Sequence, residues 1–281
     1  MKKIMFVAVA MLFAAVSCNN GPKTNAEKVA AYEAEMQKIM DAYEAAGDKD
    51  AVEDETIRKI VDLSLATIKK YPSDSVALNA LRECYYYADP DELKDAIDRL
   101  PDAFKEDSFV KRVAEGLEAK INTMAGKPFV DFTVDHVLGE NPDGSLAIEK
   151  RSLSDYVGKG KYVLVDFWSP WCPPCKAELP NIVNVYNKYH GDNFDVLSVA
   201  VWEESRGMNW KNTIDTAAVY GITWNQINNG HQEPAALYGI EGIPHVILFG
   251  PDGSIVKRDL RGKALEEAVA AIARSWKSGK R

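Results

Sequence analysis

Two cysteines separated by two prolines are the residues in this sequence best suited to chemistry. Cys172 and Cys175 follow an apolar run typical of a buried strand and open a stretch with helical spacing. A thiol at a helix N-terminus faces unpaired N–H groups and the positive end of the helix dipole, which lower its pKa. Pro173 and Pro174 suit the first helical turn, which needs no N–H. The pattern predicts a dithiol in which Cys172 attacks a disulfide and Cys175 resolves the mixed disulfide.

A C-x-x-C pair can also serve as half of a zinc site or as a structural disulfide. Zinc would need two further ligands at matching spacing, but the four histidines are scattered singly: His136, His190, His231 and His245. A structural disulfide fits poorly with the strand-to-helix context and with the preceding Trp171. We therefore expect no metal, and no cofactor other than a redox-active disulfide between Cys172 and Cys175.

Two segments resemble a known family. Residues 165–176 (VDFWSPWCPPCK), followed by Pro180, are similar to the active-site segment of thioredoxins. Residues 238–244 (YGIEGIP) are similar to the segment that carries the cis-proline of that fold. In the family this proline lies against the dithiol, and the neighbouring backbone pairs with the substrate strand. The resemblance implies a catalytic position for Pro244 and active-site flanking positions for four residues: Trp171, Pro173, Pro174 and Ile243.

The resemblance runs from residue 126 to the C-terminus and narrows to one subfamily. The N-terminal leader, residues 126–132 (GKPFVDF) and the long segment between Val201 and Tyr238 are similar to the TlpA/ResA-like lipoproteins. These are membrane-tethered, extracytoplasmic thiol-disulfide oxidoreductases. The resemblance implies a thioredoxin-like α/β fold, a mixed sheet flanked by helices, for residues 125–281.

Two carboxylates are candidates for the proton acceptor of Cys175. Asp166 lies within an apolar strand and matches the buried acid of thioredoxins; burial would raise its pKa toward neutrality. Glu178 shares a helix face with Cys175 and matches the active-site glutamate of ResA-like proteins. Each also has a structural interpretation: backbone donors could satisfy Asp166, and Glu178 could complement the dipole of its own helix. The sequence leaves open which acid serves Cys175.

The N-terminus is typical of an export signal. Lysines precede the apolar residues 4–16, a stretch shorter than the roughly 20 residues that a membrane-spanning helix needs. Residues 15–18 (AVSC) resemble a bacterial lipoprotein cleavage box. We therefore expect residues 1–18 to be a lipoprotein signal peptide with Cys18 lipidated, and residues 19–25 to be a linker. An ordinary signal peptide is the alternative. The expected location is the cell envelope, anchored by lipid and facing the periplasm.

Two stretches of different character follow. Residues 26–124 are rich in Ala, Glu, Lys, Leu and Asp with apolar residues at helical spacing, which predicts a domain of four or five helices. Residues 125–281 alternate strand-like and helical stretches, which predicts a mostly parallel sheet. The expected strands are 162–167, 194–201 and 245–249, and the expected helices are 177–189, 210–220 and 264–277. Asp252-Gly253 predicts a late antiparallel hairpin.

Several other residues receive packing interpretations. Cys84 is expected to be a buried core thiol, with an intermolecular bond as the alternative. His245 is expected to fill a strand position, with contact to substrate as the alternative. Three tryptophans are expected to pack in the core or in the inserted segment: Trp202, Trp210 and Trp224.

The leader and the dithiol together predict an exported oxidoreductase. The 281 residues are 46% hydrophobic with a net charge of −8, which excludes a disordered chain and disfavours nucleic-acid binding. The resemblance implies that the dithiol reduces disulfides of exported client proteins and is reduced again by a membrane electron donor. The lipid anchor would provide the membrane contact. The alternatives are a peroxidase of the same fold and a partner-binding module whose dithiol is secondary.

Overall fold

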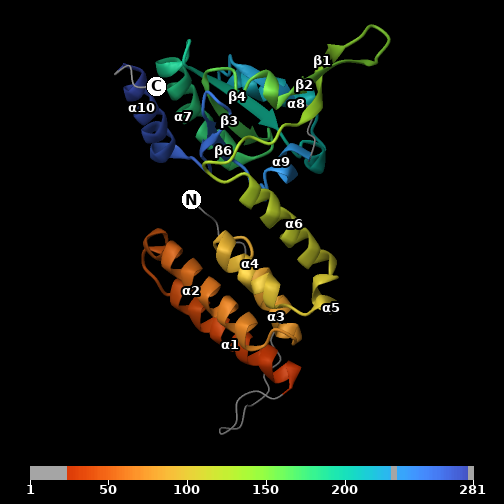
Figure 1. The fold of residues 1–281 in the computed structure, drawn as a ribbon, viewed down its shortest axis with the longest axis vertical. Helices are drawn as coiled ribbons and strands as arrows, with labels where there is room; N and C mark the ends of the chain where they lie inside the picture. Colours follow the sequence, from red (N-terminus) through yellow and green to blue (C-terminus); the bar gives the residue numbers. More distant parts are fainter. Residues whose placement is uncertain (1–23, 229–232, 278–281) are drawn as a thin grey trace. The chain divides into compact units, whose positions relative to one another are not determined.

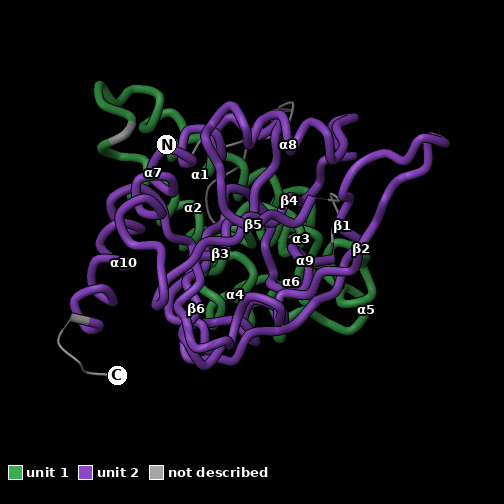
Figure 2. The backbone as a smooth tube through the Cα atoms, turned by 90° about the horizontal axis from the view of Figure 1, so that it is seen from above, with its two compact units in different colours: residues 1–117 green, residues 118–281 purple. Residues whose placement is uncertain are grey.

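The computed structural model describes residues 24–228 and 233–277, so the predicted lipidation site Cys18 lies outside the described residues. The chain divides into two compact units, residues 1–117 and 118–281 (Figure 2). The predicted domain boundary was residue 124/125, after the last helix of the first unit, whereas the compact division falls inside that helix. Within the described ranges no helix is both long and apolar enough to cross a membrane.

The first unit is helical, as its apolar spacing predicts. The helices are α1 (Asn25–Glu44), α2 (Lys49–Lys70), α3 (Ser75–Cys84), α4 (Pro90–Arg99), α5 (Asp102–Lys105) and α6 (Ser108–Asn122) (Figure 1). The sixth helix, one more than expected, arises because a single turn, α5, forms between Pro101 and α6. The hydroxyl of Thr24 caps α1 and the carboxylate of Asp48 caps α2, each accepting a backbone N–H of the first turn.

Cys84 lies in the core of this unit. Its thiol is fully buried and unpaired, and burial raises its pKa to about 12. A thiol with so high a pKa has almost no thiolate at neutral pH and is chemically inert. The packing interpretation of Cys84 is therefore confirmed.

The second unit contains a five-stranded sheet of order β5-β4-β3-β6-β7. The strands are β3 (Tyr162–Trp168), β4 (Phe194–Ala200), β5 (Asn225–Asn228), β6 (His245–Phe249) and β7 (Ile255–Lys257). β3 is parallel to β4 and β4 to β5, but β6 is antiparallel to both β3 and β7. The sheet is thus evenly mixed instead of mostly parallel, because the chain returns through β6 beside β3.

Alternation along β3 separates two hydrophobic clusters. Val163, Val165 and Phe167 face one cluster, whereas Leu164 and Trp168 face the other. The second cluster contains both active-site cysteines and is covered by α7 (Pro173–Tyr189) and α10 (Gly262–Lys277), which lie together over one face of the sheet (Figure 1). The dithiol loop, which directly follows β3, therefore lies on this face of the sheet.

The sequence did not reveal six of the remaining described elements. β1 (Thr133–Glu140) and β2 (Leu146–Ser152) form a separate antiparallel hairpin whose tip extends away from the sheet (Figures 1 and 2). β5 and α9 (Glu233–Leu237) are short. The 3-10 turns η1 (Leu153–Asp155) and η2 (Glu204–Arg206) and the helix α8 (Trp210–Val219) complete the unit, and α8 matches its prediction.

Candidate active site

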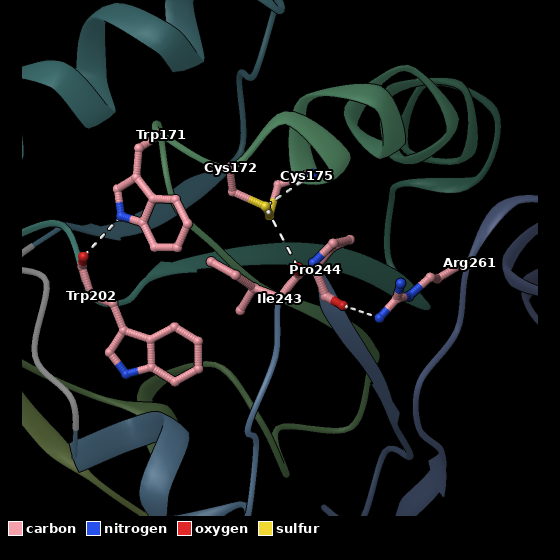
Figure 3. Close-up of a disulfide and its surroundings, with 7 residues drawn as sticks. All are labelled: Trp171, Cys172, Cys175, Trp202, Ile243, Pro244 and Arg261. Atoms are coloured by element: carbon pink, nitrogen blue, oxygen red, sulfur yellow. Dashed lines mark hydrogen bonds between the residues drawn. A yellow bond between two sulfur atoms is a disulfide. The ribbon is translucent and has the colours of Figure 1, made fainter. Parts of the chain in front are cut away.

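Cys172 and Cys175 form a disulfide at the start of α7 (Figure 3). Cys172 is the N-cap of the helix, and the N–H of Cys175 donates to its Sγ at 3.1 Å. Because Pro173 and Pro174 carry no N–H, the first available donor of α7 is that of Cys175, and it is directed at the sulfur of Cys172. In the reduced protein the same N–H and the helix dipole would stabilise a Cys172 thiolate.

The Ile243–Pro244 peptide bond is cis and lies against the disulfide (Figure 3). The Sγ of Cys172 is 3.6 Å from the carbonyl oxygen of Ile243. The carbonyl oxygen of Pro244 accepts a hydrogen bond of 2.7 Å from the Nη2 of Arg261. Arg261 precedes α10, and nothing in the local sequence indicated that it would reach the proline loop.

Asp166 lies on β3 between Leu164 and Trp168, so its side chain faces the cluster that contains both cysteines. The side chain is buried, and neither carboxyl oxygen has a hydrogen-bond partner among the described residues. Burial, followed by the negative charge of Glu178, raises the pKa of Asp166 to about 8. The interpretation of Asp166 as an acid satisfied by backbone donors is therefore wrong.

Glu178 is also buried, but its carboxylate is hydrogen-bonded. Its Oε1 accepts from the backbone N–H of Gly262 at 2.8 Å and from the Nδ2 of Asn181 at 3.2 Å. Gly262 is the first residue of α10, so Glu178 complements the N-terminus of α10 instead of that of its own helix. The two acids thus differ sharply: the carboxylate of Glu178 has hydrogen-bond donors, and that of Asp166 has none in the part of the chain that the structure describes.

Trp171, directly before the dithiol, is held by the turn that follows β4. Its indole N–H donates to the carbonyl oxygen of Trp202 at 2.8 Å (Figure 3). The guanidinium of Arg206 lies 5.4 Å from the centre of the Trp171 ring. Sequence reasoning assigned Trp202 only to packing and did not single out Arg206; the length of the inserted segment was the one available signal.

His245, directly after the cis-proline, lies between two charged side chains, Arg258 and Asp259. Its Nε2 lies 3.3 Å from the Nη2 of Arg258, and its Nδ1 lies 3.8 Å from Asp259. Burial and then the charge of Arg258 lower the pKa of His245 to about 3. A neutral imidazole that accepts from Arg258 fits the prediction of a strand-filling role.

Within the second unit, Arg258 binds the segment of residues 118–123, which contains the C-terminal end of α6. Its guanidinium donates to the carbonyl oxygens of Lys120, Thr123 and Tyr238. The guanidinium thus adds donors to carbonyl groups at and beyond the C-terminal end of α6, where a helix has too few N–H partners. Across the described residues, no group of three or more His, Cys, Asp or Glu side chains is arranged to hold a metal ion.

Residues 125–258 match the AhpC/TSA family. The chain is 29% identical over 109 residues to the thiol-disulfide oxidoreductase ResA of Bacillus subtilis. The aligned segment covers 39% of this chain and 57% of that protein. It is 29% identical over 133 residues to ResA of Halalkalibacterium halodurans, covering 47% of this chain and 66% of that protein. The chain therefore spans less than two thirds of the length of these curated relatives.

A solved structure, the thioredoxin domain of a thiol-disulfide oxidoreductase from Bacteroides vulgatus, is also similar. It shares 29% identity, with a TM-score of 0.41 over 53% of this chain and 96% of that domain. The predicted fold is confirmed: an N-terminal helical region is followed along the chain by a mixed sheet flanked by helices. Residues 125–258 therefore match the AhpC/TSA family, have a thioredoxin-like fold and are similar in sequence to the thiol-disulfide oxidoreductase ResA.

Proposed function

We propose that this protein is a thiol-disulfide oxidoreductase that reduces disulfides of other proteins through Cys172 and Cys175. The observation that supports this most is the placement of the disulfide: Cys172 caps α7, accepts the N–H of Cys175 and lies 3.6 Å from the carbonyl oxygen of Ile243. An incoming client strand can hydrogen-bond to the backbone beside Pro244 while its disulfide meets the attacking sulfur.

The reaction transfers two electrons from the dithiol to the client. The thiolate of Cys172 attacks one client sulfur, which forms a mixed disulfide and releases the other client sulfur as a thiolate that takes up a proton. Cys175 then loses its proton and attacks the Sγ of Cys172. This step releases the second client thiol and leaves the Cys172–Cys175 disulfide of the structure.

Asp166 is the better candidate to accept the proton of Cys175. Its buried carboxyl faces the cysteine cluster, has no competing partner and has a pKa raised to about 8, close to that of a thiol. Glu178 is held by Gly262 and Asn181, and a proton on its carboxylate would weaken both bonds. We therefore assign proton transfer to Asp166 and a positioning role to Glu178.

The cellular setting is part of the same proposal. A signal peptide ending at Cys18 would export the chain and attach it by lipid to a membrane of the cell envelope, facing the periplasm. The clients would be exported proteins with disulfides. The oxidised dithiol would then need a membrane electron donor to return it to the reduced state.

Equilibration of the dithiol with glutathione tests the direction of the reaction. A reductase is expected to have a potential at or below that of thioredoxin, about −270 mV. A potential near −120 mV, that of a strong disulfide donor, would overturn the assignment as a reductase.

The two alternatives make different predictions. A peroxidase would consume hydrogen peroxide in a reaction that requires Cys172, at a rate comparable to its rate of disulfide reduction. A partner-binding module would keep its full cellular function after a Cys172→Ser substitution. A reductase is expected to consume hydrogen peroxide far more slowly than it reduces disulfides. Its Cys172→Ser variant is expected to lose its cellular function.

A further inference from the structure

Trp171 is fixed at its edge and covered on one face by a single turn. The indole N–H is bound by the carbonyl oxygen of Trp202, and the Arg206 guanidinium lies 5.4 Å from the ring centre, within cation–π range (Figure 3 shows the first of these contacts). Trp171 directly precedes Cys172. Any client that reaches the attacking sulfur therefore passes close to the indole and to the Arg206 guanidinium over it.

The turn that carries Arg206 is anchored on both sides. Trp202 has a φ of 59°, in the left-handed region, and its carbonyl oxygen also accepts from the hydroxyl of Ser205 at 2.7 Å. Glu203, next in the chain, is buried and accepts a hydrogen bond from the hydroxyl of Thr213 on α8. The fixed backbone of this turn places Arg206 over the indole of Trp171.

Arg206 keeps its hydrogen-bonding capacity for a ligand. The residue is exposed, and among the described side chains its contact is with the Trp171 ring, not with a carboxylate. A guanidinium stacked on a ring leaves its planar fork of N–H donors free for a carboxylate. Pro173 and Pro174, exposed next to the attacking cysteine, offer no N–H donor. Arg206 can therefore offer a negative group on the client the N–H donors that Pro173 and Pro174 lack.

We propose that Arg206 is a specificity-determining residue of this site and favours client disulfides with Asp or Glu beside the attacked cysteine. The inference rests on the proposed function, because it concerns the client of that same dithiol. Glu204, exposed in the same turn, carries the opposite charge, but the charged group over the Trp171 ring is the guanidinium of Arg206. The preference is expected to be modest, because an exposed ion pair is weak and is screened by salt.

Three synthetic peptides test this proposal. Each has one intramolecular disulfide, and they differ only in the residue beside the attacked cysteine, which is Glu, Gln or Lys. The reduced full chain is expected to reduce the Glu peptide about two- to five-fold faster than the Lys peptide at low salt, the range of an exposed ion pair. In about 1 M salt, where the Debye length is roughly 3 Å, the ratio is expected to approach one.

Variants separate the local charge from the net charge. Arg206→Gln is expected to abolish the Glu-over-Lys ratio, and Arg206→Glu to reverse it. Lys211→Gln is the matched control: Lys211 is exposed on α8, its loss changes the net charge equally, and the cation over the Trp171 ring is Arg206, not Lys211. This control is expected to keep the wild-type ratio.

Equal rates for the Glu and Lys peptides in the wild-type chain would overturn the role of Arg206, as would an unchanged ratio in Arg206→Gln. Failure of the wild-type dithiol to reduce any of the three peptides is a different result. It would contradict the proposed function itself, and the inference about Arg206 with it.

Discussion

At the scale of single residues, the site contains two buried acids in opposite electrostatic conditions. Glu178 has two hydrogen-bond donors, and Asp166 has none among the described residues. The sequence could identify both acids, because one lies in an apolar strand and the other one helical turn beyond Cys175. It could not decide between them, because the deciding donor, the N–H of Gly262, comes from a distant part of the chain.

An Asp166→Asn substitution is expected to slow the release of client from the mixed disulfide. Without the carboxylate, Cys175 must lose its proton to water, and a general base contributes about 10²-fold or more. The rate of resolution at pH 7, measured by stopped flow after mixing the reduced variant with a disulfide peptide, checks this. The deficit should shrink at high pH, where Cys175 ionises without help; a pH-independent deficit would contradict the assignment.

The same substitution is expected to change how stability depends on pH. Because the pKa of Asp166 is raised to about 8 in the folded protein, the folded chain holds a proton that the unfolded chain releases. Stability is therefore lost as the pH rises from about 4 to about 8. In the oxidised protein, Asp166→Asn should remove this loss of stability. Relative to the wild type, its free energy of unfolding should be about 3–5 kcal/mol higher at pH 8 and little changed at pH 4. Urea unfolding of both proteins across this range measures it, and parallel curves would refute it.

At the scale of elements, β3, α7 and α10 bring the site together. β3 supplies Asp166, α7 supplies the cysteines, and Glu178 of α7 joins the first residue of α10. A continuous apolar run predicted β3, and helical stretches predicted α7 and α10; α7 begins at Pro173, one helical turn before its predicted start. The hairpin of β1 and β2 was missed because charged and exposed residues interrupt its alternation.

Two substitutions of Glu178 test its role between α7 and α10. Glu178→Gln keeps an acceptor for the N–H of Gly262, whereas Glu178→Ala leaves this helix terminus without one. We expect Glu178→Ala to lower the free energy of unfolding by about 1–2 kcal/mol and Glu178→Gln to lower it by less. Chemical denaturation of the two variants measures the difference.

The pH profile of Glu178→Gln then separates positioning from proton transfer. Because the charge of Glu178 contributes to the raised pKa of Asp166, its removal should move the resolution profile to lower pH while the maximum rate is retained. A loss of rate as large as that of Asp166→Asn, without such a shift, would instead make Glu178 the proton acceptor.

At the scale of the whole molecule, all the residues of the candidate site belong to the unit of residues 118–281. This unit contains both clusters around the sheet and the bonds of Arg258 to the end of α6. The helical unit was recognisable from spacing alone, but spacing says nothing of its role. The compact division inside α6 was not predictable, because helical periodicity continues across residues 117 and 118.

A fragment of residues 118–281 is expected to fold and to reduce a neutral disulfide peptide at a rate within about two-fold of the full chain. The reason is that every contact described for the site lies within it. Circular dichroism and the peptide reduction rate check the two parts of the prediction. A folded fragment that has lost most of its activity would show that the helical unit takes part in the reaction.

Trapping of the mixed disulfide tests the central claim most directly. A Cys175→Ala variant, reduced and mixed with a disulfide peptide, cannot complete the reaction. Mass spectrometry is expected to find one peptide attached to Cys172, and none on a Cys172→Ala variant or on the buried Cys84. Absence of the adduct on Cys172, or attachment to Cys175 at the same rate when Cys172 is replaced, would contradict the account.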